Sequence, residues 1–254
     1  MVNASPMIEV EELSVSYAGK PALDQVTLDV RRNEILAVIG PANSGKTTLL
    51  NCINRMIETI PAASVSGTVK VDGHDVAEYR DPSMLRRRIG MVFPLPVGLP
   101  MTVYENVAFA PRMAGERDRT VLDESVERCL KQSALWDEVK DRLDDLGTRL
   151  SGGQQQRLTI ARALSLNPEI LCLDEFSIAV DPVTTMKIEE VLKELNKDMT
   201  IVMVTNLVLQ AKRMADRTAL LLNGKLVEVG DNEVIFSRQA ADARTFQYVQ
   251  GLFG

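Results

Sequence analysis

A glycine-rich stretch near the start of the chain has the residue types and the spacing that bind phosphate. Gly40 and Gly45 bracket it and Lys46 and Thr47 follow, which fits the P-loop pattern G-x-x-x-x-G-K-[ST]. Glycines allow successive backbone N–H groups to wrap around phosphate oxygens, and the lysine adds a positive charge. The Thr47 hydroxyl suits Mg²⁺, a hard cation that prefers oxygen ligands. The predicted cradle for a nucleoside triphosphate consists of Gly40, Pro41, Ala42, Asn43, Ser44, Gly45, Lys46, Thr47 and Thr48.

The elements on either side of this loop favour phosphate binding over a chance glycine turn. The wholly apolar run Ile35–Ile39 predicts a buried strand, and residues 49–53 continue as a helix. A strand that leads through glycines into a helix N-terminus is the context in which this pattern binds phosphate. The strands and helices must therefore place this loop at the edge of an α/β sheet.

Polar residues also follow a second apolar run. Residues 170–173 are wholly apolar, which is typical of a central parallel strand that is covered on both faces. Asp174 and Glu175 come directly after it. Because ligands gather at the carboxyl ends of parallel strands, we expect both carboxylates to lie near the P-loop. One of them could hold hydrated Mg²⁺, and the other could accept a proton from water.

Two other features have an ordinary structural interpretation beside a functional one. Ser151 is a good N-cap for a helix predicted over 158–166. Gly152 and Gly153 leave N–H groups open to an anion, although Ser-Gly-Gly is also common in linkers. Tyr17 stands at the end of a predicted strand, where its ring could stack on a purine or simply cover a sheet edge.

Strands and helices alternate along most of the chain. Alternating apolar and polar residues over 8–15 and 22–30 predict an antiparallel hairpin with one buried face and a turn at 18–21. Thr102 and Glu105 are placed as in a capping box, and the helical periodicity with dense charge that follows predicts a helical subdomain inserted into the core. A type I′ turn at Asn223-Gly224 is expected to join a strand over 218–222 to a strand over 225–229. The remaining predicted elements are a helix over 182–195 and strands over 66–72, 89–93 and 200–205.

The composition is that of an ordinary globular protein. The 254 residues include 45% hydrophobic and 25% charged residues, and the net charge is -6. That charge argues against nucleic acid as a partner, because phosphate backbones attract basic surfaces. Three scattered cysteines and one histidine do not suggest a disulfide framework or a zinc site, and they favour a reducing cytoplasm. Residues 1–7 lack the features of a signal peptide and no apolar run could span a bilayer, so we expect membrane association only through a partner.

Over essentially its whole length the chain resembles the ATP-binding subunit of ABC transporters. The P-loop, the signature segment 150–154 (Leu-Ser-Gly-Gly-Gln), the Walker B strand that ends in Asp174-Glu175, and Asp181 come in the family's order and spacing. The resemblance implies an α/β fold: a P-loop NTPase core with a mixed, mainly parallel sheet, an N-terminal antiparallel β subdomain and an inserted α-helical subdomain.

The resemblance also implies a role for each candidate residue, with ATP and Mg²⁺ as the cofactors. Two ATPase subunits pair head to tail, so that each ATP lies between the P-loop of one chain and the signature of the other. Glu175 is then the general base, and Thr47 and Asp174 are the metal ligands. Tyr17 stacks on the adenine. The signature residues that contact the nucleotide are Ser151, Gly152, Gly153 and Gln154.

The implied partners are membrane-spanning permease subunits, a second ATPase subunit and, indirectly, a solute-binding protein. In this family the helical subdomain receives a coupling helix from the permease, which places the chain at the cytoplasmic face of the cell membrane as a peripheral subunit.

Subdomain boundaries follow from the same resemblance, within one ABC ATPase domain over 1–254. The antiparallel β subdomain is expected over about 6–35 and 64–80, the P-loop core over about 36–63, 81–94 and 158–222, the helical subdomain over about 95–157, and a C-terminal hairpin and helix over about 218–254.

Within the family, the framework segments 49–56, 85–93 and 99–108 look like the ATPase of phosphate importers. The transported solute never touches this subunit. Phosphate import is therefore implied by resemblance alone.

Two positions depart from the family pattern. Pro94 stands where the family has a glutamine that reaches Mg²⁺ and the attacking water, and Asn206 stands where it has a histidine that contacts the γ-phosphate. Proline has no side-chain amide, and asparagine, a predicted catalytic residue here, can donate a hydrogen bond but cannot carry positive charge. Phe176 and Ser177 replace a usual Pro-Thr as a milder change.

These departures leave two functions open. The first is a transport ATPase with a weakened site, whose partner in a heterodimer could supply an intact glutamine and histidine. The second is a regulatory subunit that dimerises on ATP and scarcely hydrolyses it, since binding rests on Lys46, the loop amides and Mg²⁺.

Overall fold

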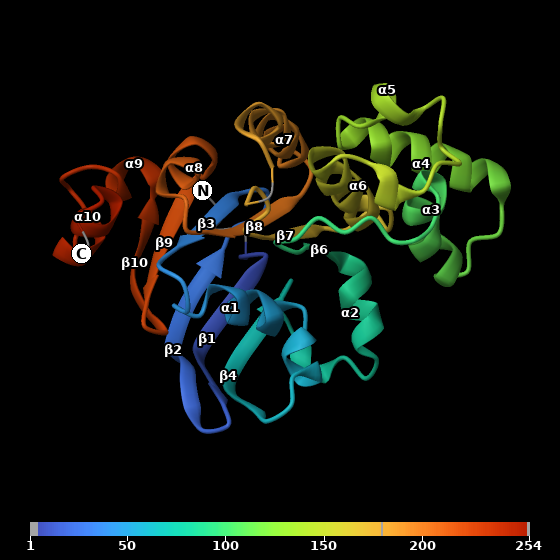
Figure 1. Cartoon of the computed structure of the whole chain (residues 1–254). Coiled ribbons are helices and arrows are strands. Elements are labelled where there is room, and N and C mark those ends of the chain that lie inside the picture. The colour runs from blue at the N-terminus through green and yellow to red at the C-terminus, as the bar shows by residue number, and fades with distance from the viewer. Residues whose placement is uncertain (1–4, 179, 253–254) are drawn as a thin grey trace. The chain divides into compact units, whose positions relative to one another are not determined.

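The computed structural model describes residues 5–178 and 180–252 of the chain (Figure 1). The chain divides into two compact units: Met1–Arg86 with Met199–Gly254 form the first unit, and Arg87–Asp198 form the second. Residues 1–4, which entered the expectation that no signal peptide is present, lie outside the described residues. No helix in the described ranges has the length and the apolar character needed to cross a membrane. The finer subdomain boundaries stay predictions.

An antiparallel sheet opens the first unit, and its strands run in the order β2-β1-β4-β5. The bounds are Ile8–Tyr17 for β1, Lys20–Val30 for β2, Ala63–Val71 for β4 and His74–Asp75 for β5. Apolar residues of β1 alternate into the core, as the sequence pattern predicts.

Three of these strands are longer than the sequence predicts: β1 continues to Tyr17, and β2 and β4 begin earlier. The turn between β1 and β2 needs only two residues, so Lys20 and Pro21, which the sequence pattern assigns to the turn, begin β2. Ala63, predicted as loop, begins β4 because it pairs with Tyr17 of β1. At the starts of β2 and β4, pairing across the sheet extends the strand into residues that have weak strand preference of their own.

A second sheet of the first unit carries the P-loop. Within this unit its strands run in the order β10-β9-β3-β8, with bounds Ile35–Ile39 for β3, Thr200–Thr205 for β8, Arg217–Leu222 for β9 and Lys225–Asp231 for β10. β3 is parallel to β8 and β9, whereas β10 is antiparallel to β9. Asn223 and Gly224 join β9 to β10 with φ of 50° and 78°, as a type I′ turn requires. The predicted mixed sheet is therefore confirmed.

Short helices complete the first unit. They are α1 (Lys46–Ile53), α8 (Val208–Met214), α9 (Asn232–Ile235) and α10 (Ala243–Val249), and the chain passes into the second unit within α2 (Pro82–Arg88).

A buried ion pair links the two sheets of the first unit. Nη1 of Arg217 on β9 lies 3.0 Å from Oδ2 of Asp29 on β2 and 3.1 Å from Oε1 of Glu34, and only 7% of the arginine side chain is exposed. Burial raises the pKa of the Glu34 carboxyl, although a backbone hydrogen bond from Arg31 and the charge of Arg217 oppose the shift. The pair fixes β9, the strand that leads into the turn beside the P-loop.

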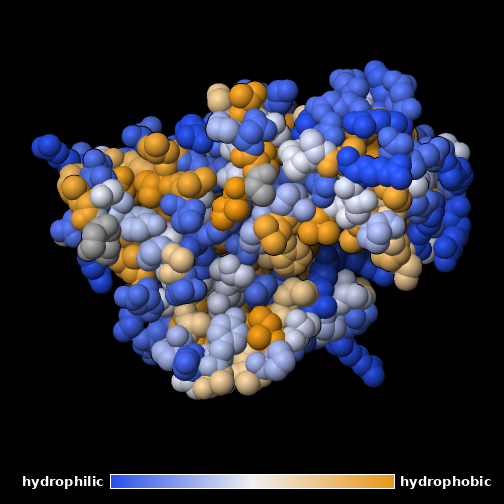
Figure 2. Space-filling model, in the orientation of Figure 1, coloured by the Kyte–Doolittle hydropathy of each residue, from blue (hydrophilic) through white to orange (hydrophobic). Residues whose placement is uncertain are grey.

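The second unit packs helices around a parallel strand pair. The strands are β6 (Ile89–Val92) and β7 (Ile170–Asp174), and the helices are α3 (Val103–Met113), α4 (Arg119–Gln132), α5 (Trp136–Val139), α6 (Gly152–Leu164) and α7 (Pro182–Leu195). α3, α4 and α6 contact one another. The surface over α4 and α5 is mostly hydrophilic (Figure 2), in keeping with the dense charge of the predicted helical subdomain.

One helix start and one capping box in this unit correct the sequence predictions. α6 begins at Gly152 and not at Leu158, because Ser151 and Gln154 form a complete capping box that nucleates the helix at the glycines. Thr102 caps α3 as predicted, since its Oγ1 accepts from the Glu105 N–H at 3.0 Å. The Glu105 carboxylate, however, pairs with Arg112 about two turns further along the same face of α3 and does not complete a capping box.

Candidate functional site

The P-loop closes over its own lysine. Lys46 is 5% exposed, and its Nζ donates to the backbone oxygens of Gly40 at 2.9 Å and Pro41 at 2.8 Å. Gly45 caps α1 with a φ of 101°, and a Cβ there would lie 2.6 Å from the Ala22 oxygen. The second glycine of the motif is therefore required by backbone conformation and by packing. The loop presents a positive charge at the start of α1, as an anion site needs.

The β9–β10 turn braces the P-loop from within the same unit. The Gly224 N–H donates to the Ser44 oxygen at 3.1 Å, and the Gly224 oxygen accepts from the Asp24 N–H at 2.9 Å. A Cβ on Gly40 would lie 2.2 Å from the Leu221 oxygen, so the loop touches the end of β9. Sequence reasoning identified the Asn223-Gly224 turn but missed this role, because no local signal connects residues so far apart in the chain.

Replacing Gly224 by alanine is expected to destabilise the chain more than the same change at Gly73. Gly224 has a φ of 78° and Gly73 has a φ of 75°. Both alanine variants therefore carry the strain of a left-handed backbone conformation, about 1 kcal/mol or more. Only at Gly224 would the new Cβ meet backbone, 2.7 Å from the Ala22 oxygen, whereas nothing lies within 4 Å at Gly73. Overpacking adds about 1–3 kcal/mol, which urea unfolding measures. Equal losses in the two variants would contradict a tight brace.

Two more of the predicted residues lie in the first unit. The Tyr17 hydroxyl is hydrogen-bonded to Thr48 Oγ1 at 3.1 Å, which connects the end of β1 to α1. Asn206 is exposed directly after β8. Because Ile39 pairs with Thr205 in the parallel register, Asn206 and the P-loop follow the carboxyl ends of neighbouring strands. The first unit therefore places Asn206 and the P-loop at the carboxyl ends of neighbouring strands, and Tyr17, from the antiparallel sheet, against the helix that follows the P-loop.

The predicted carboxylates lie in the second unit. Asp174 ends β7 at 2% exposure, and Glu175 follows with a φ of 42°. A positive φ is uncommon outside glycine, and such outliers cluster at functional sites. Val92 pairs with Leu173, so Pro94 and the two carboxylates follow the carboxyl ends of adjacent strands. This register brings Pro94, which departs from the family pattern, and the Walker B carboxylates to one end of the strand pair.

The loop that contains Pro94 is anchored to α6. The Gly98 N–H donates to Gln155 Oε1 at 3.1 Å, and Arg162 Nη1 donates to the Val97 oxygen at 3.1 Å. Burial lowers the pKa of Arg162, whose guanidinium still binds this loop. No local sequence signal indicates these anchors, because they join residues 57 and 65 positions apart.

The signature segment forms the N-terminal turn of α6. Ser151 and Gly152 are exposed, and Gly153 and Gln154 are half-buried. A Cβ on Gly153 would lie 2.9 Å from Thr184 Cγ2, so the second glycine permits the close approach of α7. The exposed start of this capped helix can present N–H groups to an anion.

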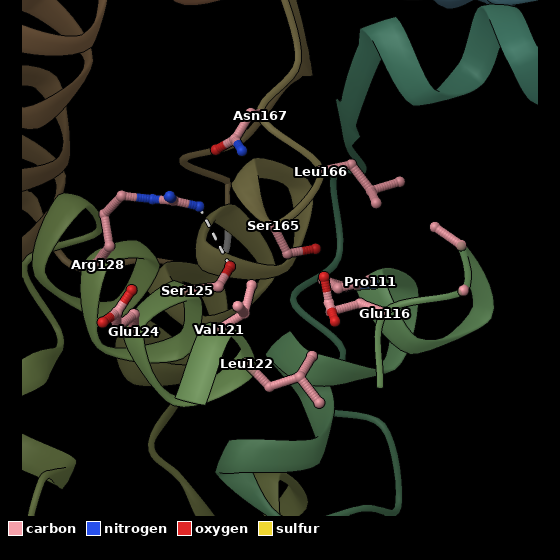
Figure 3. A pocket seen from close by; sticks show the side chains of 12 residues that line it. Pro111, Glu116, Val121, Leu122, Glu124, Ser125, Arg128, Ser165, Leu166 and Asn167 are labelled. Carbon is pink, nitrogen blue, oxygen red and sulfur yellow. Dashed lines mark hydrogen bonds between the residues drawn. The ribbon is translucent and has the colours of Figure 1, made fainter. Parts of the chain in front are cut away.

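A hollow of about 460 Å³ opens between the end of α3, the start of α4 and the turn after α6 (Figure 3). Its wall includes Pro111, Val121, Ser125, Arg128, Ser165 and Asn167. Arg128 Nη2 donates to Ser125 Oγ at 3.2 Å, and Val121 is 45% exposed. The wall thus combines an apolar side chain with polar groups that can hydrogen-bond a visiting segment.

A P-loop between a parallel strand and a helix defines a P-loop NTPase, and the comparisons with known proteins define the family. A family model described as "ABC transporter" matches residues 23–177, more than half of the chain. The chain therefore belongs to the ABC transporter family. It is an ATP-binding subunit of that family and a transport ATPase.

Solved structures of this family share the fold. cbiO1 from Clostridium perfringens, part of the ABC transporter complex cbiONQ, is 26% identical, with 93% of this chain and 92% of that chain covered and a TM-score of 0.81. A dimeric post-hydrolysis state of the ATP-binding cassette MJ0796, bound to ADP and Pi, is 29% identical over 89% and 99% of the two chains, with a TM-score of 0.77. An ATP-binding subunit of an ABC transporter is 25% identical over 97% and 100%, with a TM-score of 0.78. The predicted fold class is confirmed.

Proposed function

We propose that this chain powers an ABC importer, with phosphate as the solute, by closing as a dimer on Mg-ATP and reopening after hydrolysis. The observation that carries the proposal is the braced P-loop with its buried Lys46. Import and phosphate rest on the resemblance of 49–56, 85–93 and 99–108 to phosphate-import ATPases.

The residue roles follow the family pattern. Residues 40–48 cradle the phosphates of ATP, and Tyr17 stacks on the adenine. Glu175 takes a proton from the attacking water as general base, while Asn206 donates a hydrogen bond to the γ-phosphate. The signature residues Ser151, Gly152, Gly153 and Gln154 contact the ATP held by the second subunit.

Mg²⁺ fits the oxygen donors of this chain. No group of three or more His, Cys, Asp or Glu among the described residues is placed to hold a metal. Mg²⁺ commonly binds through one or two protein oxygens together with substrate phosphates. Thr47, exposed at the start of α1, and Asp174 would supply those oxygens, and the ion would neutralise charge on the phosphates.

A second ATPase subunit and a permease are the proposed partners. The MJ0796 cassette forms a dimer with ADP and Pi, and cbiO1 is part of a complex, which supports both partners for this chain. We assign the hollow lined by Val121 and Arg128 to the coupling helix of the permease, since it lies in the helical region and offers apolar and polar contacts. The chain would then sit at the cytoplasmic face of the membrane, with a solute-binding protein as an indirect partner.

Replacing Val121 by aspartate is expected to uncouple the chain from its permease. A charge in the hollow opposes burial of the coupling helix, so permease-stimulated ATP turnover and uptake of labelled phosphate into vesicles should fall about tenfold or more, which corresponds to about 1.4 kcal/mol. Turnover of the isolated chain should not change. Val65→Asp is the matched control, because Val65 is equally exposed (46%) but lies on β4.

Two results would contradict these assignments. Equal loss of coupling in the Val121 and Val65 variants would remove the hollow as the docking surface. Failure of the unmodified chain with its permease to drive phosphate uptake, while it turns over ATP, would remove phosphate as the solute.

Pro94 and Asn206 support a second candidate function. A chain without the family's glutamine and histidine could bind ATP, dimerise and hydrolyse little, as a regulatory subunit or as one half of a heterodimer. In a heterodimer its signature segment would complete the competent site of the partner. The turnover measurements described in the Discussion separate this candidate from the first.

A further inference from the structure

The signature segment is held by a carboxylate from another helix of the same unit. Glu138 on α5 directs both oxygens at α6: Oε1 accepts from Arg157 Nη1 at 2.7 Å, and Oε2 accepts from Arg157 Nη2 at 3.1 Å and from Gln154 Nε2 at 2.8 Å. Three donors therefore converge on one carboxylate. Bidentate, charge-assisted hydrogen bonds of this kind are stronger than neutral ones, and they also fix the orientation of the side chains that they join.

Each of the two side chains that Glu138 binds also bonds the backbone of the signature segment. Gln154 Oε1 accepts from the Ser151 N–H at 3.1 Å, and Arg157 Nε donates to the Gly153 oxygen at 3.3 Å. Arg157 is 6% exposed, and its Nη1 also donates to the Ala134 oxygen at 2.6 Å. The carboxylate thus lies one side chain away from the backbone at both ends of the Ser-Gly-Gly turn.

The charge environment keeps this carboxylate ionised. The hydrogen bond from Arg157 lowers the pKa of Glu138 most, the hydrogen bond from Gln154 and the charge of Arg157 add to it, and the charge of Lys187 on α7 acts in the same direction against the effect of burial. An ionised carboxylate accepts hydrogen bonds only, which matches the three donors it faces.

We propose that Glu138 is a positioning residue for the signature: by fixing the amide of Gln154 and the guanidinium of Arg157, it holds the first N–H groups of α6 in the arrangement that receives the ATP of the second subunit. The inference rests on the proposed role of residues 151–154. It assigns Glu138 no contact with the nucleotide.

A glutamine at position 138 should break this arrangement although its shape is almost the same. Its side chain has one acceptor oxygen and one NH₂ group, so one of the three donors must face another donor. If the Gln154 amide flips to relieve that conflict, its own NH₂ turns to the Ser151 N–H and the capping box is lost. An aspartate keeps both acceptor oxygens but has one methylene less, so Glu138→Asp should have the smaller effect.

The test compares Glu138→Gln with Glu127→Gln in the full chain. Glu127, on α4, is similarly exposed (46% against 39%) and pairs only with Lys131 in the described contacts, so it is the matched control. Three quantities are measured: amide hydrogen exchange of peptides that cover 150–157 and 40–50, nucleotide affinity, and Mg-ATP turnover. Exchange shows whether the turn has loosened, and it does not depend on activity.

The proposal predicts exchange faster by about fivefold or more over 150–157 in Glu138→Gln, with 40–50 unchanged. It also predicts a kcat lower by about tenfold or more, with nucleotide affinity within about twofold, because the signature acts after the P-loop has bound ATP. Adding Gln154→Ala to Glu138→Gln should lower kcat little further, since both changes interrupt the same series of hydrogen bonds from Glu138 through Gln154 to Ser151. Glu127→Gln should match the unmodified chain.

Unchanged exchange over 150–157 in Glu138→Gln, or an effect equal to that of Glu127→Gln, would overturn the proposal. An equal loss of exchange protection in the peptides 150–157 and 40–50 would also overturn the proposal, because it indicates a general loss of stability. So would a double variant, Glu138→Gln with Gln154→Ala, whose loss of kcat is the full sum of the two single losses. If the unmodified chain neither binds nor hydrolyses ATP but exchange still rises over 150–157, the proposed function fails while the positioning role of Glu138 stands.

Discussion

Changing Pro94 to glutamine and Asn206 to histidine together is expected to raise Mg-ATP turnover about 100-fold or more. One donor directed at charge in the transition state is worth roughly 2.7–4 kcal/mol, or about 10²–10³ in rate. Pro94 supplies no donor where the family has a glutamine, and Asn206 supplies only a neutral donor where the family has a histidine. Asn206 is exposed after β8, so a histidine ring can be accommodated without burial of a charge. Pro94 follows β6 in a loop whose Gly98 and Val97 anchors the change does not touch.

Pro96→Gln is the matched control for the change at position 94. Pro96 lies in the same loop and is also half-buried, but it does not occupy the family's glutamine position. Adding Glu175→Gln to the double variant should remove the gained turnover, because the general base contributes typically about 10²–10⁴-fold. If the double variant and Pro96→Gln turn over ATP at the same rate, the departures at 94 and 206 do not limit hydrolysis.

Replacing Lys46 by alanine is expected to weaken ATP binding about 100-fold or more. The change removes a buried charge whose loss typically costs about 2–5 kcal/mol, and about 1.4 kcal/mol is a factor of ten in affinity. It also leaves the oxygens of Gly40 and Pro41 without their ammonium donor, so the loop loses part of its internal support. Titration calorimetry with ATP measures the affinity directly.

Lys70→Ala is the control for this charge change. Lys70 lies on β4 in the same unit and pairs with Glu11 at the surface, so its loss should leave affinity within about twofold. Thermal unfolding without nucleotide identifies any general loss of structure in Lys46→Ala. An affinity within about threefold of the unmodified chain would contradict a phosphate-binding role for Lys46.

The sequence predicts well those elements whose signals are local. β3 is a continuous apolar run, β8 is an apolar run between two threonines, and both have the predicted bounds. α7 begins with Pro182 behind the Asp181 cap and ends at Leu195, as the pattern indicates, since a capping aspartate and a proline at the first position act within one turn. The Asn223-Gly224 turn forms for the same reason.

The sequence does not predict contacts between residues that lie far apart along the chain. The sequence pattern predicts the start of α6 six residues too late, because the capping box of Ser151 and Gln154 outweighs the poor helix preference of two glycines. The pairing of Glu138 with Arg157 and the bond from Gly224 to Ser44 join residues 19 and 180 positions apart. No periodicity or local motif encodes such contacts, because only the folded chain brings these residues together.

The measurement that tests the central claim most directly is steady-state Mg-ATP turnover by the unmodified chain at saturating ATP, beside its Glu175→Gln variant. A working transport ATPase predicts turnover that the Glu175→Gln change lowers by about 10²-fold or more while ATP still binds. Turnover of about 1 s⁻¹ or faster would further show that Pro94 and Asn206 are tolerated. ATP binding without any turnover that depends on Glu175 would contradict the ATPase account and leave the chain as a nucleotide-binding regulatory subunit.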